Sequence, residues 1–264
     1  MANITVKDWI ADNTQDFPVR IHPHMIANIA AYKFVTLPDR ETLEALLRQS
    51  CSENGLKGTI LLAPEGINMF LAGEKTGIEV FLSLLKTDAR FADLEPKWSW
   101  SDFVPFKRLR VKLKKEIVTF RTPGLDPVGA PAPLLSAAEL RRWYDEGRDF
   151  VILDTRNDWE YREGTFKNAI NPQLNNFCEF PKATENLDEL KQKTVVTFCT
   201  GGIRCEKAAP LLQQQGFSDV YQLQGGILKY FEECGGAHWK GNCVVFDERG
   251  SLDPQLRPTI TAPQ

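Results

Sequence analysis

The sequence predicts a two-domain α/β protein, and three observations carry that prediction. Strand and helix patterns alternate from about residue 31 to 120 and again from residue 134 to 237. Between these stretches lies TPGLDPVGAPAP at 122–133, whose four prolines and two glycines disfavour both helix and strand and predict a linker. A chain of 264 residues, 42% of them hydrophobic, is long and apolar enough for two packed cores.

The composition excludes several classes of protein. A net charge of -3 argues against binding polyanions over the whole surface, although it allows a local basic patch. No apolar run approaches the length of a membrane span, and the N-terminal MANITVKDWIADNTQDF lacks a secretory signal pattern. We therefore expect a cytoplasmic protein without a membrane partner. The six irregularly spaced cysteines contain no Cys-x-x-Cys pair, and only three histidines occur, so we expect free thiols and no metal site.

Residues 1–121 form the first predicted domain. After a short helix at VKDWIADN and a surface loop around His22 and His24, AAYKFVTL predicts a strand and PDRETLEALLRQSCSENG a helix. LKGTILLA and INMFLAG predict two strands joined by the turn PEG, EKTGIEVFLSLLKTD predicts a second helix, and a further strand follows LEPKWSW. This β-α-β-β-α-β order is that of a ferredoxin-like (acylphosphatase-like) α+β domain, which by itself implies no single function.

Residues 134–237 form the second predicted domain. LSAAELRRWYDEG predicts a helix with Ser136 as N-cap and Glu139 completing a capping box. The apolar runs in DFVILDTR, TVVTFCT and DVYQLQGG predict buried strands, and ENLDELKQK, CEKAAPLLQQQG and ILKYFEECGG predict helices. This alternation indicates a parallel sheet with helices on both faces. In residues 238–264 we expect a strand at NCVVFDERG and then an extended tail.

The segment VVTFCTGGIRCEKA at 195–208 carries the strongest chemical signal. It predicts a buried strand, a tight loop and the start of a helix, which places Cys199 at the carboxyl end of the strand. Loop N–H groups, the helix N-terminus and the charge of Arg204 would all stabilise a thiolate or persulfide anion there. Cys199 is thus a candidate nucleophile or sulfur carrier in an anion cradle made by Thr200, Gly201, Gly202, Ile203 and Arg204.

Two cysteines in this segment have alternative interpretations. Cys199 would be an inert core thiol if only packing mattered, but such a thiol does not need two glycines and an arginine after it. Cys205, at the helix start, either resolves a disulfide or persulfide of Cys199 or packs within the helix.

The segment KRLRVKLKK at 107–115 predicts a strand with an apolar face and a cationic face. Successive side chains of a strand point to opposite sides, so Leu109, Val111 and Leu113 share one side. The cations on the other side are Arg108, Arg110, Lys112 and Lys114. They form either a solvated face that discourages edge pairing or a ridge that binds a phosphate backbone.

The second domain resembles a rhodanese domain. The similarity is carried, in order, by LLSAAEL, VILDTRNDWEY, NAINP, FCTGGIRCEKA and LQGGI. The six residues from Cys199 to Arg204 match the loop length of rhodaneses, which act on sulfur, whereas the related phosphatases have a loop one residue longer. The resemblance also places Asp154 and Arg156 at a strand end, where a structural ion pair is expected.

A wider resemblance covers the chain from about residue 31 to 250. It is carried by YKFVTLPD, APEGIN at 63–68, LRVKLKKEIV, CTGGIRCEKA and VVFDER. These motifs are similar to those of the rhodanese-containing tRNA uridine(34) 5-hydroxylase family (UPF0176-like), in a short form without the cysteine-rich C-terminal extension of many members. The resemblance implies an oxidoreductase that forms 5-hydroxyuridine at the wobble position of tRNA, with molecular oxygen as co-substrate and no bound cofactor.

The same resemblance assigns roles to particular residues. Cys199 corresponds to the reactive cysteine of the family, and it either attacks uridine C6, making C5 nucleophilic, or carries a persulfide or sulfenate. The cationic strand becomes the candidate contact for the tRNA anticodon loop, through Arg108, Arg110, Lys112 and Lys114.

Two other functions remain open at this point. A thiosulfate-type sulfurtransferase would need only the second domain and a persulfide on Cys199. A non-catalytic tRNA-binding module would need the cationic strand and could dispense with the cysteine. The oligomeric state is not predicted.

Overall fold

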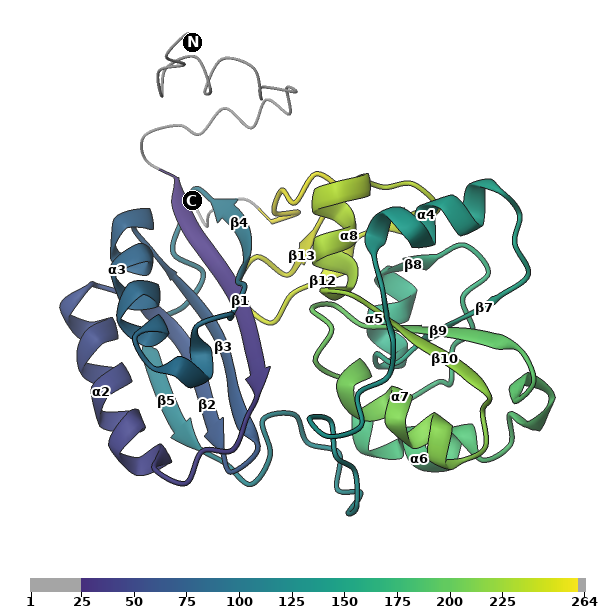
Figure 1. Cartoon of the computed structure of the whole chain (residues 1–264). Coiled ribbons are helices and arrows are strands. Elements are labelled where there is room, and N and C mark those ends of the chain that lie inside the picture. The colour runs from purple at the N-terminus through teal and green to yellow at the C-terminus, as the bar shows by residue number, and fades with distance from the viewer. Residues whose placement is uncertain (1–24, 261–264) are drawn as a thin grey trace, which may run out of the picture.

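The computed structural model describes residues 25–260, which fold into two α/β domains lying side by side (Figure 1). The short helix expected at VKDWIADN and the loop around His22 and His24 lie outside these residues. Within the described range, no helix combines the length and the hydropathy needed to cross a bilayer.

The first domain is a five-stranded sheet with two helices packed on one face. Its elements are β1 (Ile26–Phe34), α2 (Arg40–Glu53), β2 (Lys57–Ala63), β3 (Gly66–Gly73), α3 (Lys75–Lys86), the short 3-10 helix η1 (Ala89–Phe91), β4 (Lys97–Ser101) and β5 (Leu109–Leu113). The strand order is β4-β1-β3-β2-β5, with β5 parallel to β2 and every other neighbouring pair antiparallel. The ferredoxin-like order is thereby confirmed, and β5 extends it as an edge strand.

One strand of this domain is displaced from its expected position. The strand predicted to follow LEPKWSW is formed by KWSWS itself, because these residues pair with β1, with Trp98 opposite Ile29. The core lies between the sheet and helices α2 and α3, where Met69 and Phe81 are fully buried. The other face of the sheet is turned toward the second domain (Figure 1), so its side chains are free to build a site there.

The second domain has a parallel sheet of order β6-β10-β9-β7, as predicted. Its elements are β6 (Leu134–Leu135), α4 (Ala137–Asp145), β7 (Val151–Asp154), α5 (Asp158–Glu163), β8 (Gly164–Phe166), η2 (Phe177–Glu179), α6 (Phe180–Thr184), η3 (Asp188–Leu190), β9 (Thr194–Phe198), α7 (Cys205–Gln214), β10 (Asp219–Leu223) and α8 (Gly226–Cys234). Separate hydrophobic clusters fill the two faces of the sheet, one against α4 and α8 and the other against α6 and α7.

The C-terminal part adds short strands to this domain. β11 (Trp239–Gly241) pairs with β8, and β12 (Cys243–Val244) forms a hairpin with β13 (Ser251–Leu252). The strand expected at NCVVFDERG is therefore present but short. Between β5 and β6 the chain forms neither helix nor strand, and the placement of the linker at 122–133 stays a prediction.

Two local predictions for the second domain are wrong. The helix expected over ENLDELKQK is the single 3-10 turn η3, because the segment buries too few apolar side chains to stabilise a longer helix. The Ser136 hydroxyl accepts the Glu139 N–H at 3.1 Å as expected. The Glu139 carboxylate, however, binds the Trp143 indole N–H one turn on, at 2.7 Å, instead of closing a capping box.

Candidate active site

Cys199 occupies the loop that leaves the carboxyl end of β9. Its side chain is buried, with 1% of its surface exposed. The Gly202 N–H donates to Cys199 Sγ at 3.2 Å, and the Cys199 carbonyl accepts the Ile227 N–H from α8 at 3.0 Å. Gly202 has φ of 99°, and a Cβ at this position would lie 2.8 Å from the Tyr32 hydroxyl. The loop therefore requires glycine at position 202.

The surroundings of Cys199 lower the pKa of its thiol. Burial alone would raise that pKa, but a hydrogen bond from Cys205, the charge of Arg204 and the N–H groups of Arg204 and Gly202 outweigh it. The pKa of Cys205 moves the other way, because burial and the neighbouring Cys199 sulfur both disfavour a second thiolate. The opposite directions of the two pKa shifts favour a single thiolate, on Cys199.

Arg204 is a buried partner of Glu160 rather than the free cation expected from the sequence. Its two terminal nitrogens donate to the two Glu160 carboxylate oxygens at 2.8 and 2.9 Å. The Phe246 ring lies over the guanidinium at 5.7 Å. Because Glu160 offsets the charge, Arg204 stabilises a thiolate less than an unpaired arginine would, and its main effect is to hold the loop.

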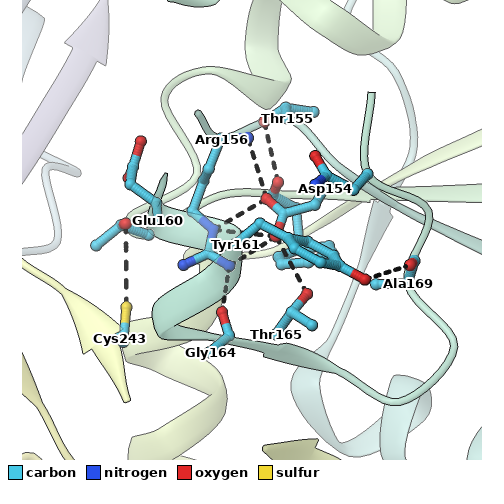
Figure 2. A network of polar contacts seen from close by, with 12 residues as sticks. Asp154, Thr155, Arg156, Glu160, Tyr161, Gly164, Thr165, Ala169 and Cys243 are labelled. Atoms are coloured by element: carbon cyan, nitrogen blue, oxygen red, sulfur yellow. Dashed lines mark hydrogen bonds and ion pairs between the residues drawn. The ribbon is translucent and has the colours of Figure 1, made fainter. Parts of the chain in front are cut away.

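A second buried ion pair lies at the end of β7 (Figure 2). Arg156 and Asp154 have fully buried side chains that meet at 2.6 Å, and Arg156 also donates to the Gly164 carbonyl at 2.6 Å. The Thr165 hydroxyl donates to Asp154 at 3.2 Å. The contact confirms the structural ion pair expected at this strand end.

The loop opens into a cavity of about 200 Å³ between the two domains. The second domain contributes the Cys199 loop together with Leu228 and Phe246. The first domain closes the opposite side with residues of β1, β3 and β4, namely Ala30, Ala31, Tyr32, Asn68, Phe70 and Lys97. The thiol site is therefore complete only when both domains are present.

A hydrogen-bond chain joins the first domain to α7 beside the thiol. The Tyr32 hydroxyl donates to Glu206 Oε1 at 3.0 Å, and Gln222 Nε2 donates to Glu206 Oε2 at 3.1 Å. Burial raises the pKa of Glu206, and burial followed by the charge of Glu206 raises the pKa of Tyr32. Tyr32 lines the cavity, and its bond to Glu206 keeps the Tyr32 hydroxyl close to Gly202.

A second polar contact between the domains explains the APEGIN motif. Lys207 of α7 is buried, and its ammonium lies 2.9 Å from Glu65 and 2.8 Å from Glu116. Glu65 also accepts the Ile117 N–H at 2.8 Å, and Asn68 donates to the Ile117 carbonyl at 3.1 Å. The motif therefore does more than turn a hairpin, since it fixes the segment after β5 and docks α7.

The cationic side chains of β5 lie away from the thiol, on the face of the sheet that is turned toward the second domain. Arg108, Arg110, Lys112 and Lys114 are all exposed. Of the apolar side chains on the other face, Val111 is buried, whereas Leu113 is 38% exposed at the end of the strand. β5 is the edge strand of the sheet, three strands from β1, so these cations do not line the cavity.

Sequence reasoning missed several residues around Cys199. Tyr32, Lys97 and Phe246 line the cavity, Glu206 holds Tyr32, and Glu160 pairs with Arg204. They come from five separate elements or loops, so no local spacing links them. The available signal was indirect, because Tyr32, Phe246, Glu206 and Glu160 lie within the quoted motifs YKFVTLPD, VVFDER, CTGGIRCEKA and VILDTRNDWEY.

Comparison with known proteins agrees with this architecture. Residues 26–117 match the UPF0176 acylphosphatase like domain, and residues 136–233 match the rhodanese-like domain. The protein thus belongs to the class in which a rhodanese-type cysteine loop is covered by an acylphosphatase-like sheet.

Curated relatives show which family within this class the chain belongs to. A tRNA uridine(34) hydroxylase of Cupriavidus necator is 56% identical over 239 residues, which cover 88% of this chain and 85% of that protein. Proteins of the same name from Bordetella avium and Thiobacillus denitrificans are 55% and 54% identical over 88% of this chain, covering 99% and 96% of their own lengths. The chain belongs to the tRNA uridine(34) hydroxylase family, as the sequence motifs indicated.

Proposed function

We propose that this chain hydroxylates C5 of uridine 34 in tRNA and that Cys199 is its nucleophile. The observation that carries the proposal is the cavity, in which a buried low-pKa thiol faces a wall supplied by the other domain. A sulfurtransferase needs only the cysteine loop, whereas a two-domain cavity suits a larger substrate that must be positioned against the thiol. The names of the relatives supply the substrate and the reaction.

The reaction can be written with a full balance of atoms and electrons. One uridine, one O₂ and two thiols give 5-hydroxyuridine, one water and one disulfide. In the first step an electron pair of the Cys199 thiolate forms a bond to C6. The C5–C6 π electrons move toward the C4 carbonyl, which makes C5 electron-rich. C5 then bonds to O₂ and becomes a hydroperoxide, and loss of the C5 proton expels the thiolate as the S–C6 bond breaks. Two free thiols then reduce the O–O bond, which leaves the hydroxyl group on C5 and gives water and the disulfide.

Cys205 is the thiol of this chain best placed to act with Cys199. Each sulfur shifts the pKa of the other, downward for Cys199 and upward for Cys205, so Cys205 stays a thiol beside the Cys199 thiolate. Cys205 is fully buried and lies 3.9 Å from the Thr155 hydroxyl, so a bulky external thiol does not reach it without rearrangement. We assign to it the role of resolving thiol, which forms the disulfide with Cys199 when the pair supplies the two electrons.

We place the RNA along the sheet face that leads from the cavity to the cationic edge. Two rows of paired residues cross the strands on the face toward the second domain. One row is Ala30, Phe70, Thr59 and Arg110, and the other is Tyr32, Asn68, Leu61 and Lys112. Three strand spacings separate the ends of each row, about 14 Å. A phosphate on this edge therefore belongs to a nucleotide a few positions from the base in the cavity.

Two exposed aromatic rings, one of which lines the cavity, would give a neighbouring base a place to stack. Trp159 and Phe246 are 51% and 50% exposed, and their ring centroids are 6.2 Å apart in an edge-to-face arrangement. Phe246 also lines the cavity that holds Cys199. A base next to uridine 34 would cover the exposed rings when the target base enters the cavity.

The decisive experiment measures 5-hydroxyuridine by mass spectrometry of tRNA nucleosides. Purified chain is incubated with unmodified tRNA, a thiol reductant and O₂, and with Cys199→Ala as the comparison. We expect product with the wild type and none with Cys199→Ala or without O₂. Product formed by Cys199→Ala would refute the role of the thiol, and strong thiosulfate:cyanide turnover without any hydroxylation would favour the sulfurtransferase.

A further inference from the structure

Lys97 differs from the other cations that are withdrawn from solvent in this structure. The buried cations Arg156, Arg204, Lys207 and Arg249 each lie against at least one carboxylate. Lys97 is partly buried at the start of β4, and no carboxylate within residues 25–260 lies at ion-pair distance from its ammonium. A cation withdrawn from water without a counterion is costly, so its position needs another explanation.

Lys97 lines the thiol cavity and also the neighbouring groove that Glu95, Glu206 and Lys229 line. Lys97 lines this cavity together with Cys199 and Tyr32, and it is paired in the sheet with Ala30, which also lines it. The ammonium rests over the Tyr32 ring, 4.7 Å from its centroid. This contact holds the charge in place. Unlike a carboxylate, the ring does not neutralise the ammonium.

The charged groups around Lys97 leave room for an anion. The nearby carboxylates are Glu206, which is occupied by Tyr32 and Gln222, and Glu95 on the preceding loop. Lys229 is also near, but its ammonium is paired with Glu232 at 3.2 Å and Glu233 at 3.4 Å. Burial lowers the pKa of Lys97, while the negative Cys199 and Glu206 oppose that change. The cavity thus has one cation that lacks a fixed partner.

We infer that Lys97 is a catalytic residue that binds the O4 oxygen of uracil and stabilises the negative charge that develops there when the Cys199 thiolate adds to C6. In that step the S–C6 bond forms, the C5–C6 π pair shifts to C4–C5, and the C4–O4 π pair moves onto O4. A positive charge already fixed beside O4 favours this transition state over the neutral ground state. The inference rests on the proposed function, and it adds the group that receives the displaced charge.

A test that does not depend on hydroxylation uses two alkylating reagents of similar shape. Iodoacetate is an anion and iodoacetamide is neutral, so their rate ratio at Cys199 reports a cation in the cavity. We expect Lys97→Met to lower the iodoacetate-to-iodoacetamide ratio about tenfold. Lys229→Met, which removes a lysine already paired with carboxylates, should leave the ratio within about twofold. An unchanged ratio in Lys97→Met, or an equal fall in both variants, would overturn the inference.

The second test follows hydroxylation and separates catalysis from binding. Lys97→Met should lower kcat about 100-fold, the lower end of what removing one such donor costs, and change KM for tRNA by less than about threefold. Lys97→Arg should recover part of kcat, whereas Lys97→Gln should not. A rise in KM with unchanged kcat would show that Lys97 only binds RNA. If the wild type forms no product, the proposed function fails, while the alkylation ratio still decides whether Lys97 serves as an anion site.

Discussion

The ammonium of Lys207 lies 2.9 Å from the carboxylate of Glu65, so the motifs CTGGIRCEKA and APEGIN bind each other across the two domains. Glu116 completes the contact at 2.8 Å. Lys207 stands eight residues after Cys199 in the chain, which means that the helix following the thiol loop is anchored directly to the first domain. Helix α7 therefore sets both the geometry of the cavity and the contact between the two domains.

Removing Lys207 should weaken the whole structure. Lys207→Met leaves two carboxylates facing each other without a cation, and we expect a loss of about 3 kcal/mol in the free energy of unfolding. Glu65→Gln should cost less, because Glu116 still pairs with Lys207. Urea unfolding of the three proteins measures these differences. Equal stability of Lys207→Met and wild type would show that the contact does not hold the domains together.

Alkylation of Cys199 should report its lowered pKa. The thiolate is the reacting form, so the rate with iodoacetamide should rise with pH through a midpoint of about 6, against 9.0 for an ordinary thiol. Mass spectrometry of the Cys199 peptide follows the reaction, and the Cys51 peptide is an internal comparison, because burial raises the pKa of that thiol to about 12. A midpoint near 9.0 for Cys199 would contradict an anion-stabilising loop.

The two loop glycines should respond differently to alanine. Gly202→Ala must place a Cβ 2.8 Å from the Tyr32 hydroxyl at φ of 99°, so we expect a loss of about 1–3 kcal/mol in stability. A Cβ at Gly201 meets no atom within 4 Å, and Gly201→Ala should change stability by less than about 0.5 kcal/mol. Thermal unfolding compares the two variants, and equal losses would argue against the packing of Tyr32 on the loop.

Charge reversal on β5 should weaken tRNA binding without affecting the thiol. Arg110→Glu and Lys112→Glu each remove one candidate phosphate contact, so the slope of log K against log salt should fall by about 0.7 for each. Lys86→Glu is the matched control, since Lys86 is an exposed lysine of α3, on the other face of the sheet. Binding to an anticodon stem-loop at several salt concentrations measures the slope. The assignment would be wrong if all three variants behaved alike.

Truncating the exposed aromatic pair should loosen the RNA complex. Trp159→Ala should raise KM for tRNA about tenfold, in line with the loss of one stacked base, whereas Trp159→Phe should retain most of the affinity. Val80→Ala provides the comparison, because Val80 is 55% exposed and belongs to α3. The rate of Cys199 alkylation in the absence of RNA should not change. A Trp159→Ala enzyme with wild-type KM would exclude stacking on this ring.

Local sequence patterns were sufficient to predict both folds and the reactive loop. The alternation of β9, loop and α7 is written in consecutive residues, and Cys199, Gly202 and Arg204 lie within six consecutive residues. Periodicity also predicted the β-α-β-β-α-β order of elements in the first domain. It failed at ENLDELKQK, where too few apolar side chains are buried to stabilise a helix, and in the capping box of Glu139, where the Trp143 indole took the carboxylate.

Only the tertiary structure determined what surrounds the thiol. Tyr32 and Lys97 reach Cys199 from strands more than 100 residues away in the chain. Glu160 pairs with Arg204, whose positive charge the sequence alone would assign to the thiolate. Such contacts follow from how two sheets are oriented and packed, which no spacing in the sequence specifies. The sequence by itself therefore determined the fold class, the family motifs and the nucleophile, while packing of the two domains determined the cavity, its electrostatics and its unpaired cation.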